Sequence, residues 1–450
     1  MIQEECGVMG AYDFDGGDIA FDIYHGLYSL QHRGQESCGI VTNNYVKLFN
    51  VKGKGLVNEV FDKYNLETLK GNIGVGHVRY GGDETAAIPP IMSRYCKGTM
   101  TLAMNGQLTN YDRLRNELEQ RGAIFQSTSH AEIVMNMIAV ARTKTHSAED
   151  AVIAAAKKLE GAFSIVVMSP KKLIAVRDPL GVRPLALGRR DNRYYFASET
   201  AAFDVIRAQK VCDVLPGELI KIDETGVNHI RYDERKPAHC VFEFVYFARP
   251  DSRVDGISVH ETRIGIGREL YKAAPVKADL VVGVPDSGLQ FALGYSYESG
   301  IPFGHGLYKN SYVGRTFIKE TQEARTEAVS VKLNAMRDAI AGKDIVLVDD
   351  SIVRGTTCAN LVKMIKDGGA KSVHMRIASP PFLWQCDFGT DIPDRKHLIA
   401  ANMSVEQIKN HIGADSLAYL PIEAFDRVGL KPDEYCMACF TGKKPEKREN

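Results

Sequence analysis

The 450-residue sequence lacks a surplus of charge, because its 56 Lys and Arg residues balance its 56 Asp and Glu residues. A strongly basic composition is typical of proteins that bind nucleic acid or membrane surfaces, so neither partner is expected. The sequence also lacks the run of about 18 apolar residues that a membrane-spanning helix requires. The segment before Cys6 is too short and too polar for a secretion signal, so a cytoplasmic protein is predicted.

Cysteine occurs nine times. In a reducing compartment such residues are more often catalytic, metal-binding or inert than disulfide-bonded. The first of them, Cys6, lies in the stretch "MIQEECGVMG", just ahead of a predicted strand. A lone cysteine there is ordinarily a small core residue. The alternative is a nucleophile that becomes the first residue once residues 1–5 have been removed.

The character of the sequence changes near residue 235. Before that point short apolar strands alternate with helices predicted over 131–145 and 148–161, which is an α+β pattern. After the charged connector "ERKPAHC", the segments "ADLVVGVPDSG" and "KDIVLVDDSIVRGTT" contain apolar strands that suit a parallel sheet buried on both faces. We therefore predict a first domain over 6–235 and a second over 236–450. If Cys6 is a nucleophile that must become the first residue, residues 1–5 are a propeptide.

The segment "DIVLVDDSIVRGTT" predicts a phosphate-binding loop. A buried strand ends at Asp349 and Asp350, and a loop containing Gly355 leads into a helix that opens with Thr356 and Thr357. Free N–H groups at a helix N-terminus bind phosphate, and the carboxyl ends of parallel strands are where such sheets bind ligands. Adjacent carboxylates there suit ribose hydroxyls and Mg²⁺. The alternative, two capping residues in a solvated loop, explains less of the pattern.

Longer segments carry a resemblance to a known family. "VDDSIVRGTT" resembles the loop of type I phosphoribosyltransferases that binds phosphoribosylpyrophosphate (PRPP). "CVFEFVYFARPDS", "YKNSYVGRTFI" and "GADSLAYLPIEA" resemble the amidophosphoribosyltransferase family, and "CGVMG", "LQHRGQESCGI", "GHVRY" and "MNGQL" are similar to its N-terminal-nucleophile domain. The resemblance implies an αββα glutaminase domain followed by an α/β phosphoribosyltransferase domain with a parallel sheet. It also implies glutamine-dependent conversion of PRPP to 5-phosphoribosylamine, glutamate and pyrophosphate, the first step of purine synthesis.

The resemblance also assigns roles at the PRPP site. Asp349 and Asp350 are expected to hold the ribose hydroxyls and Mg²⁺, with Ser287 as a further Mg²⁺ ligand. A second set is expected to bind the phosphates of PRPP. It comprises Ser351, Arg354, Gly355, Thr356 and Thr357 in the loop, and Lys309, Tyr312, Arg315 and Lys332 in or beside a segment that closes over the substrate.

At the glutamine site the resemblance makes Cys6 the nucleophile, with its own α-amino group as base, since such a group has a pKa of roughly 8. Asn105 and Gly106 match the oxyanion hole, and Arg79 matches the partner of the glutamine α-carboxylate. The family places an acid where it pairs with the α-ammonium group of glutamine. This chain has His130 at that position, and a neutral imidazole carries no negative charge. Weaker glutamine binding is expected, with Glu132 either compensating or serving as an ordinary first-turn acid of the helix.

The spacing of Cys436 and Cys439 is that of metal ligands, for zinc or for an iron–sulfur cluster. The resemblance adds Cys240 and Cys386 and implies a structural 4Fe–4S cluster. The remaining cysteines are assigned to packing: Cys38, Cys96, Cys212 and Cys358.

The family further implies a homo-oligomer, a tetramer, that purine nucleotides inhibit. Two alternatives remain open beside the two-site enzyme. One is an ammonia-dependent phosphoribosyltransferase with a weakened glutaminase, suggested by His130. The other is a regulator that senses PRPP or nucleotides, since folds are reused for binding alone.

Overall fold

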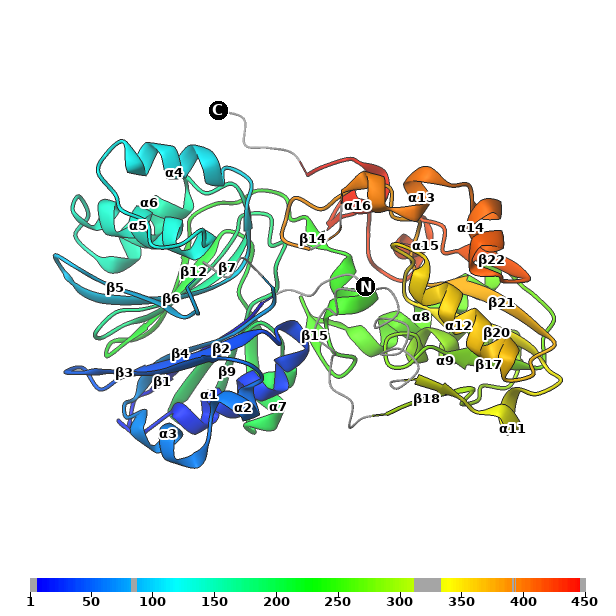
Figure 1. Ribbon diagram of the computed structural model, residues 1–450. Coiled ribbons are helices and arrows are strands. Elements are labelled where there is room, and N and C mark those ends of the chain that lie inside the picture. The colour runs from blue at the N-terminus through cyan, green and yellow to red at the C-terminus, as the bar shows by residue number, and fades with distance from the viewer. Residues whose placement is uncertain (1–5, 82–86, 311–332, 391, 393, 446–450) are drawn as a thin grey trace.

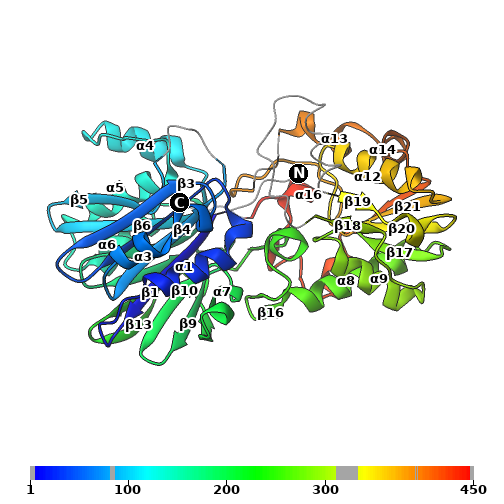
Figure 2. The same ribbon diagram turned by 60° about the horizontal axis from the view of Figure 1, so that its bottom comes forward.

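The computed structural model describes residues 6–81, 87–310, 333–390, 392 and 394–445. The first half of the chain is a sandwich of two sheets with helices on both outer faces (Figure 1). The second half is a smaller parallel sheet with helices on both sides, and Figure 2 shows the two halves side by side from another direction. The predicted fold classes are confirmed. No helix in the described ranges is long and apolar enough to cross a membrane.

Two antiparallel sheets form the inner layers of the first half. The seven-stranded sheet has the order β11 (Gln209–Asp213), β9 (Ala186–Arg190), β10 (Arg193–Ala197), β1 (Gly7–Asp13), β4 (Ile73–Arg79), β2 (Ser37–Asn43) and β3 (Leu48–Lys54). The six-stranded sheet has the order β13 (Gly226–Arg231), β12 (Glu218–Asp223), β8 (Leu173–Arg177), β7 (Gly161–Met168), β6 (Gly98–Leu108) and β5 (Ile91–Tyr95). Val8, Val75, Ala103 and Val166 belong to the apolar core between them.

Helices cover the outer faces of these sheets. Below the first sheet in Figure 1 lie α1 (Ala20–Ser29), α2 (Val57–Val60), α3 (Lys63–Thr68) and α7 (Ala201–Val205). The short helix η1 (Gln31–Arg33) follows α1 along the chain. Above the second lie α4 (Tyr111–Glu119), α5 (His130–Arg142) and α6 (Ala148–Ala156). Helix α1 packs closely on β4 because Gly74 and Gly76 face it: an added Cβ at either position would collide with Ile23.

The parallel sheet of the second half has the order β17 (Leu280–Gly283), β20 (Asp344–Asp349), β21 (Ser372–Ile377) and β22 (Ser416–Tyr419). Helices α8 (Val259–Ala273) and α9 (Leu289–Ser299) contribute to one core, and α12 (Thr356–Asp367) and α14 (Val405–Ile412) to the other. The short helices are η2 (Glu243–Phe247), α11 (Arg337–Ile340), η3 (Arg395–His397), α13 (Ile399–Asn402), α15 (Ala424–Arg427) and α16 (Ala438–Thr441). The short strand pairs are β14 (His239–Cys240) with β23 (Tyr435–Cys436), β15 (Arg253–Val254) with β16 (Ile257–Ser258), and β18 (Leu307–Lys309) with β19 (Leu333–Ala335).

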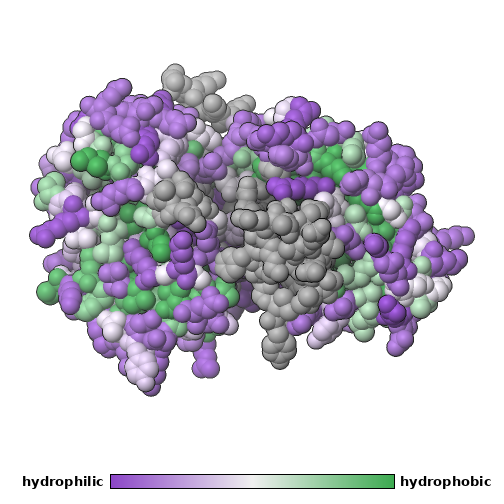
Figure 3. Space-filling model, in the orientation of Figure 1, coloured by the Kyte–Doolittle hydropathy of each residue, from purple (hydrophilic) through white to green (hydrophobic). Residues whose placement is uncertain are grey.

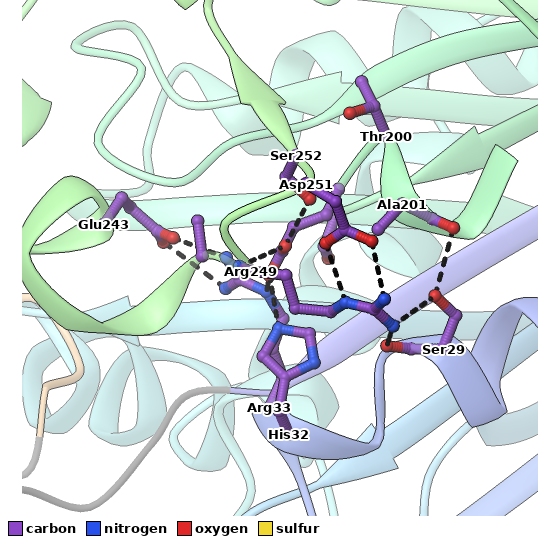
Figure 4. A network of polar contacts seen from close by, with 12 residues as sticks. Ser29, His32, Arg33, Thr200, Ala201, Glu243, Arg249, Asp251 and Ser252 are labelled. Carbon is purple, nitrogen blue, oxygen red and sulfur yellow. Dashed lines mark hydrogen bonds and ion pairs between the residues drawn. The ribbon is translucent and has the colours of Figure 1, made fainter. Parts of the chain in front are cut away.

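A buried ionic network joins the two halves (Figure 4). Arg33 forms ion pairs with both Glu199 and Glu243, and His32 Nε2 lies 2.6 Å from Glu199 Oε1. From the second half, Ser252 Oγ and the Arg249 backbone N–H donate to Glu199 Oε2 at 2.7 and 2.9 Å. Although burial raises it, the pKa of Glu199 is held well below its usual value by the charge of Arg33. The Glu199 carboxylate therefore contributes to joining the halves as a charged group.

The packing assignments of the remaining cysteines are correct for Cys38 and Cys358, which are buried, while Cys212 is half-buried. The assignment of Cys96 is wrong. Its side chain is exposed, because Cys96 lies in the turn between β5 and β6. Figure 3 shows that the described surface on one face is largely hydrophilic, with hydrophobic residues in scattered groups.

Candidate functional sites

A cavity of about 340 Å³ brings together the residues predicted for the glutamine site. Its lining includes Cys6, Arg79, Asn105, Gly106 and His130. Cys6 precedes β1, Arg79 ends β4, the Asn-Gly pair lies in β6, and His130 begins α5. Five residues from four separate elements therefore converge on one space of the size that a small ligand needs.

The backbone around Cys6 is held from three sides. Gly7 pairs with Val78 of β4, and the Val8 N–H donates to Ser198 Oγ at 3.0 Å. Gly7 carries no side chain because a Cβ would lie 2.8 Å from Val78 Cγ2 and 3.1 Å from Leu30 Cβ. The position of Cys6 is thus set by the sheet and by the end of helix α1.

Asn105 is fully buried, and within the described part of the chain neither atom of its side-chain amide has a hydrogen-bond partner. A buried amide without partners costs free energy, so such a group calls for a functional explanation. The next residue, Gly106, has φ +124, and a Cβ there would collide with the Ala162 carbonyl. The pair can offer an amide N–H and a backbone N–H to an oxygen atom bound in the cavity.

His130 is neutral in this site. Its Nδ1 accepts a hydrogen bond from the Leu108 backbone N–H at 3.1 Å, and its ring lies against Tyr111 with 4.6 Å between ring centroids. Burial lowers the pKa of His130 to about 4, against a smaller opposing effect of Asp112. An imidazole that accepts through Nδ1 carries its hydrogen on Nε2, so His130 presents a donor and no charge.

Glu132 does not line this cavity. Its carboxylate accepts from the Gln126 N–H at 2.8 Å, the Ser127 N–H at 2.9 Å and Ser127 Oγ at 2.6 Å. It therefore holds the turn before α5, as an ordinary acid in the first turn of a helix does.

The sequence interpretation missed His77 of β4. This residue lines the same cavity and is 2% exposed. Its Nε2 lies 3.0 Å from the Met104 carbonyl, which makes Nε2 the donor, and Nδ1 has no partner among the described residues. Burial lowers the pKa of His77 to about 4. The motif "GHVRY" contains this histidine, but only the register of β4 against β1, which places it opposite Val8, brings it to the cavity that Cys6 also lines.

A second site lies at the carboxyl end of β20. Asp349 and Asp350 are buried, and a small cavity beside them is lined by Ser351, Arg354, Gly355, Thr356 and Thr357. Ser287 Oγ donates to Asp350 Oδ1 at 2.6 Å, so the predicted third ligand meets the acidic pair. Burial, then the charge of Asp350, raises the pKa of Asp349 well above its usual value. Two carboxylates and a hydroxyl in this arrangement suit a divalent cation.

The loop after this pair leads into α12. Gly355 caps the helix with φ +81, a left-handed conformation that favours glycine, and a Cβ there would lie 2.6 Å from Ile399 Cδ1. Tyr246 of η2 lines the same cavity and was missed by the sequence interpretation. Arg263 holds η2 in place by donating to the Phe244 and Ala248 carbonyls at 2.7 and 2.8 Å.

The predicted closing segment is only partly covered by the described residues. Lys309, at the end of β18, forms an ion pair with Asp286, the neighbour of Ser287. Tyr312, Arg315 and Lys332 lie outside the described residues.

Four cysteines from three distant segments lie in one region. Cys240 and Cys436 are partners in the parallel ladder of β14 and β23, while Cys386 and Cys439 pack in the same apolar surroundings. Burial, and then the neighbouring Cys386, Cys240 and Cys436, raise the pKa of Cys439 well above its usual value. No group of three or more potential ligands in the described ranges is arranged to hold a metal ion. Four cysteine thiols are the ligands that a four-thiolate metal centre requires, although in this structure they are not arranged around a common point as in a formed centre.

Comparisons with known proteins identify the family. Residues 81–205 match the glutamine amidotransferase domain family, and residues 264–378 match the phosphoribosyl transferase domain family. A curated amidophosphoribosyltransferase from Methanothermobacter thermautotrophicus is 44% identical over 450 residues, which cover 99% of this chain and 95% of the relative. The chain belongs to the amidophosphoribosyltransferase family. Its relative from Bacillus subtilis is 42% identical over 99% of this chain and 94% of its own length.

Solved structures of amidophosphoribosyltransferases have the same fold. The glutamine PRPP amidotransferase from B. subtilis, complexed with ADP and GMP, superposes with a TM-score of 0.92 at 41% identity. The superposition covers 98% of this chain and 97% of that one. As a member of this family the protein is an enzyme that joins a glutamine amidotransferase to a phosphoribosyltransferase, so the regulator interpretation is set aside.

Proposed function

We propose that this chain converts glutamine, PRPP and water to glutamate, 5-phosphoribosylamine and pyrophosphate, the first step of purine synthesis. The convergence of Cys6, Arg79 and Asn105 on one cavity, in a chain of this family, carries the proposal. The test is to supply PRPP and glutamine and to measure glutamate and pyrophosphate together. The proposal fails if neither glutamine nor ammonium supports the release of pyrophosphate from PRPP.

At the first site Cys6 Sγ attacks the side-chain amide carbon of glutamine. Asn105 and Gly106 stabilise the negative oxygen that develops on that carbon, which explains why the Asn105 amide is buried without a partner among the described residues. Arg79 binds the substrate α-carboxylate. The free α-amino group of Cys6 takes up the thiol proton, so residues 1–5 must first be removed. Mass spectrometry of the purified protein tests that step, and a working enzyme that retains Met1 would contradict it.

At the second site the loop Ser351–Thr357 and the start of α12 bind the 5′-phosphate, while Asp349 and Asp350 bind the ribose hydroxyls. Mg²⁺, when bound by Asp349, Asp350 and Ser287, would offset the charge of the departing pyrophosphate. Lys309, with Tyr312, Arg315 and Lys332, contributes to closing the site and to binding the phosphates. Ammonia released at Cys6 passes inside the protein to this site, which keeps it from being protonated in bulk water.

One observation favours a second candidate, an enzyme that uses free ammonia and only poorly uses glutamine. His130 offers a neutral N–H donor where the family places an acid for the α-ammonium group. The His130→Asp variant distinguishes the two candidates. A wild type with robust glutamine turnover that Asp does not improve would rule out the weakened glutaminase.

Cys240, Cys386, Cys436 and Cys439 would hold a 4Fe–4S cluster that fastens the C-terminal segment to the start of the second half. The Arg183 guanidinium from the first half donates to the Phe388 carbonyl, so the segment that carries Cys386 also contacts the glutaminase domain. For a 4Fe–4S cluster we expect about four iron ions and about four acid-labile sulfide ions per chain, which is a ratio near one. Stoichiometric zinc after anaerobic purification would contradict it.

We further propose that the protein is a homotetramer that purine nucleotides inhibit, since the B. subtilis structure contains ADP and GMP. Mass measurement in solution, with and without these nucleotides, tests the assembly. Inhibition of pyrophosphate release by either nucleotide tests the regulation.

A further inference from the structure

Part of the wall of the cavity that contains Cys6 comes from the second half of the chain. Gly389 lines this cavity, together with residues of the first half such as Asn105 and Gln107. In the sequence Gly389 lies between β21 and η3, and thus beyond the sheet that carries the acidic pair of the PRPP site. A cavity that belongs mainly to the glutaminase domain is therefore completed by the phosphoribosyltransferase domain.

Gly389 packs against β6, the strand that carries Asn105 and Gly106. A Cβ at Gly389 would lie 3.4 Å from both the Cβ and the backbone nitrogen of Gln107, and 3.3 Å from Arg183 Nη2. Gly389 also has φ +105, a conformation that favours glycine. Little space is left for a side chain, so the backbone of the second half lies directly against the residue that follows Gly106.

Arg183 of the first half holds the segment around Gly389. Its side chain is fully buried, and its Nη2 donates to the Phe388 carbonyl and, at 3.4 Å, to Thr390 Oγ1. These two partners flank Gly389 in the sequence. The backbone of Arg183 is itself held in the first half, because its carbonyl accepts from Ser164 Oγ of β7 at 3.0 Å. Gly389 is thus attached to a fixed point of the glutaminase domain.

The charge of Arg183 makes this attachment costly to break. Arg183 Nη1 lies 3.9 Å from Glu243 Oε1, and the guanidinium carbon lies 6.0 Å from the centroid of the Phe247 ring. Both residues belong to η2 of the second half, as Phe388 and Thr390 belong to its later segment. A buried cation that loses such partners is strongly destabilising. The packing of the two halves therefore favours the arrangement in which Arg183 binds the segment.

We propose that Arg183 is a positioning residue for the glutamine site, and that it acts by holding Gly389 against Gln107. The inference rests on the proposed glutaminase function. The wall formed by Gly389 confines the bound substrate and, through Gln107, fixes the part of β6 that offers the Gly106 N–H. Displacing this wall is expected to impair the use of glutamine. It leaves the use of free ammonium, which does not require this cavity, nearly unchanged.

The first test is Gly389→Ala, with kcat/KM measured for glutamine hydrolysis and for ammonium-dependent pyrophosphate release. The new Cβ has to displace Gln107 or Arg183. We expect kcat/KM for glutamine to fall about 10- to 100-fold, the effect of a misplaced substrate, and that for ammonium to change by less than about twofold. Gly429→Ala is the matched control, because Gly429 has φ +88 but nothing lies within 4 Å of its Cβ.

The second test alters Arg183 itself. Arg183→Met removes the charge and the donors, whereas Arg183→Lys keeps the charge but has no forked group to reach two acceptors. We expect kcat/KM for glutamine to be highest in the wild type, intermediate in Arg183→Lys and lowest in Arg183→Met. Asp255→Asn controls for a general loosening of the two halves, because Asp255 pairs with the buried Arg177 of the first half at 2.6 Å.

The inference is overturned if Gly389→Ala lowers both activities equally or lowers neither, or if Gly429→Ala causes the same selective loss. It is also overturned if Asp255→Asn impairs glutamine hydrolysis as much as Arg183→Met does. Thermal unfolding midpoints show which variants are folded, and if Arg183→Met does not fold, Gly389→Ala and Arg183→Lys decide the outcome. Failure of the proposed function is distinguishable, because the wild type would then release no glutamate from glutamine.

Discussion

Arg33 and Glu243 form an ion pair across the two halves of the chain, with both side chains about 1% exposed. A second contact joins Arg33 Nη1 to Glu243 Oε1 at 3.3 Å, and Arg33 also pairs with Glu199. Arg33 follows helix α1, whose end packs on Gly7, and Glu243 begins η2, which carries Tyr246 to the cavity beside Asp349 and Asp350. The pair therefore links an element next to the Cys6 segment to an element that lines the second cavity.

We predict that Glu243→Gln destabilises the protein by about 3–5 kcal/mol, because it removes one of the two carboxylates that pair with the buried Arg33 charge. The free energy of unfolding in urea measures the effect. Lys236→Met is the control, since it removes a pair with Asp433 in which both side chains are 64% exposed. A control effect of at most about 1 kcal/mol is expected. Equal effects of the two variants would show that the buried network contributes little.

Asn105→Ala is expected to lower kcat for glutamine hydrolysis by about 10²–10³-fold, which is the usual effect of losing one oxyanion donor. Ammonium-dependent synthesis takes place at the other site and should change far less. The exposed Asn116 of α4 provides a control substitution, Asn116→Ala. A loss confined to KM would mean that Asn105 binds the substrate and does not stabilise the transition state.

Ser287→Ala is expected to raise the Mg²⁺ concentration for half-maximal pyrophosphate release by about 10–100-fold. The reason is that Ser287 Oγ orients Asp350 through a 2.6 Å hydrogen bond. The change should be the same with glutamine or ammonium as nitrogen donor. Ser299→Ala, at the far end of α9, is the control. An unchanged Mg²⁺ requirement would show that Ser287 does not contribute to Mg²⁺ binding.

His77 should make the protein less stable in mild acid. Its pKa is about 4 in the folded protein, because burial disfavours the charged form, and about 6.5 in the unfolded chain. Between these values the unfolded chain binds more protons, so the free energy of unfolding decreases as the pH falls from about 6.5 to 4. The loss attributable to His77 is at most about 3 kcal/mol.

Unfolding of the wild type and of His77→Gln from pH 7 to pH 4.5 measures this contribution. The decrease should be smaller in His77→Gln, whose side-chain amide can still donate to the Met104 carbonyl. His146→Gln, at an exposed position, should follow the wild type. Identical pH profiles for the wild type and His77→Gln would refute this assignment.

The sequence predicts best those parts of the sites that lie within one contiguous segment. The strand, the acidic pair and the helix from Asp344 to Asp367 follow one another along the chain, so apolar periodicity and a glycine suffice to predict them. The helix predicted over 148–161 ends at Ala156, and β7 already begins at Gly161, where φ is +119. Local patterns thus predict the element but not its end.

Features that depend on distant residues could not be predicted in this way. His77 and Tyr246 reach their sites through strand register and through the packing of η2, neither of which a local pattern encodes. The substitution at His130 is visible in the sequence, but its neutral state depends on the Leu108 N–H and on burial. The roles assigned to individual site residues, and the domain limits at 5 and 235, remain predictions.

The most direct test of the central claim is the stoichiometry of products from PRPP and glutamine in a single reaction with Mg²⁺. We predict that glutamate and pyrophosphate form in a ratio near one, and that Cys6→Ala abolishes both while ammonium restores pyrophosphate alone. Release of pyrophosphate with neither nitrogen donor, or glutamate formation that Cys6→Ala leaves intact, would contradict a two-site enzyme with Cys6 as its nucleophile.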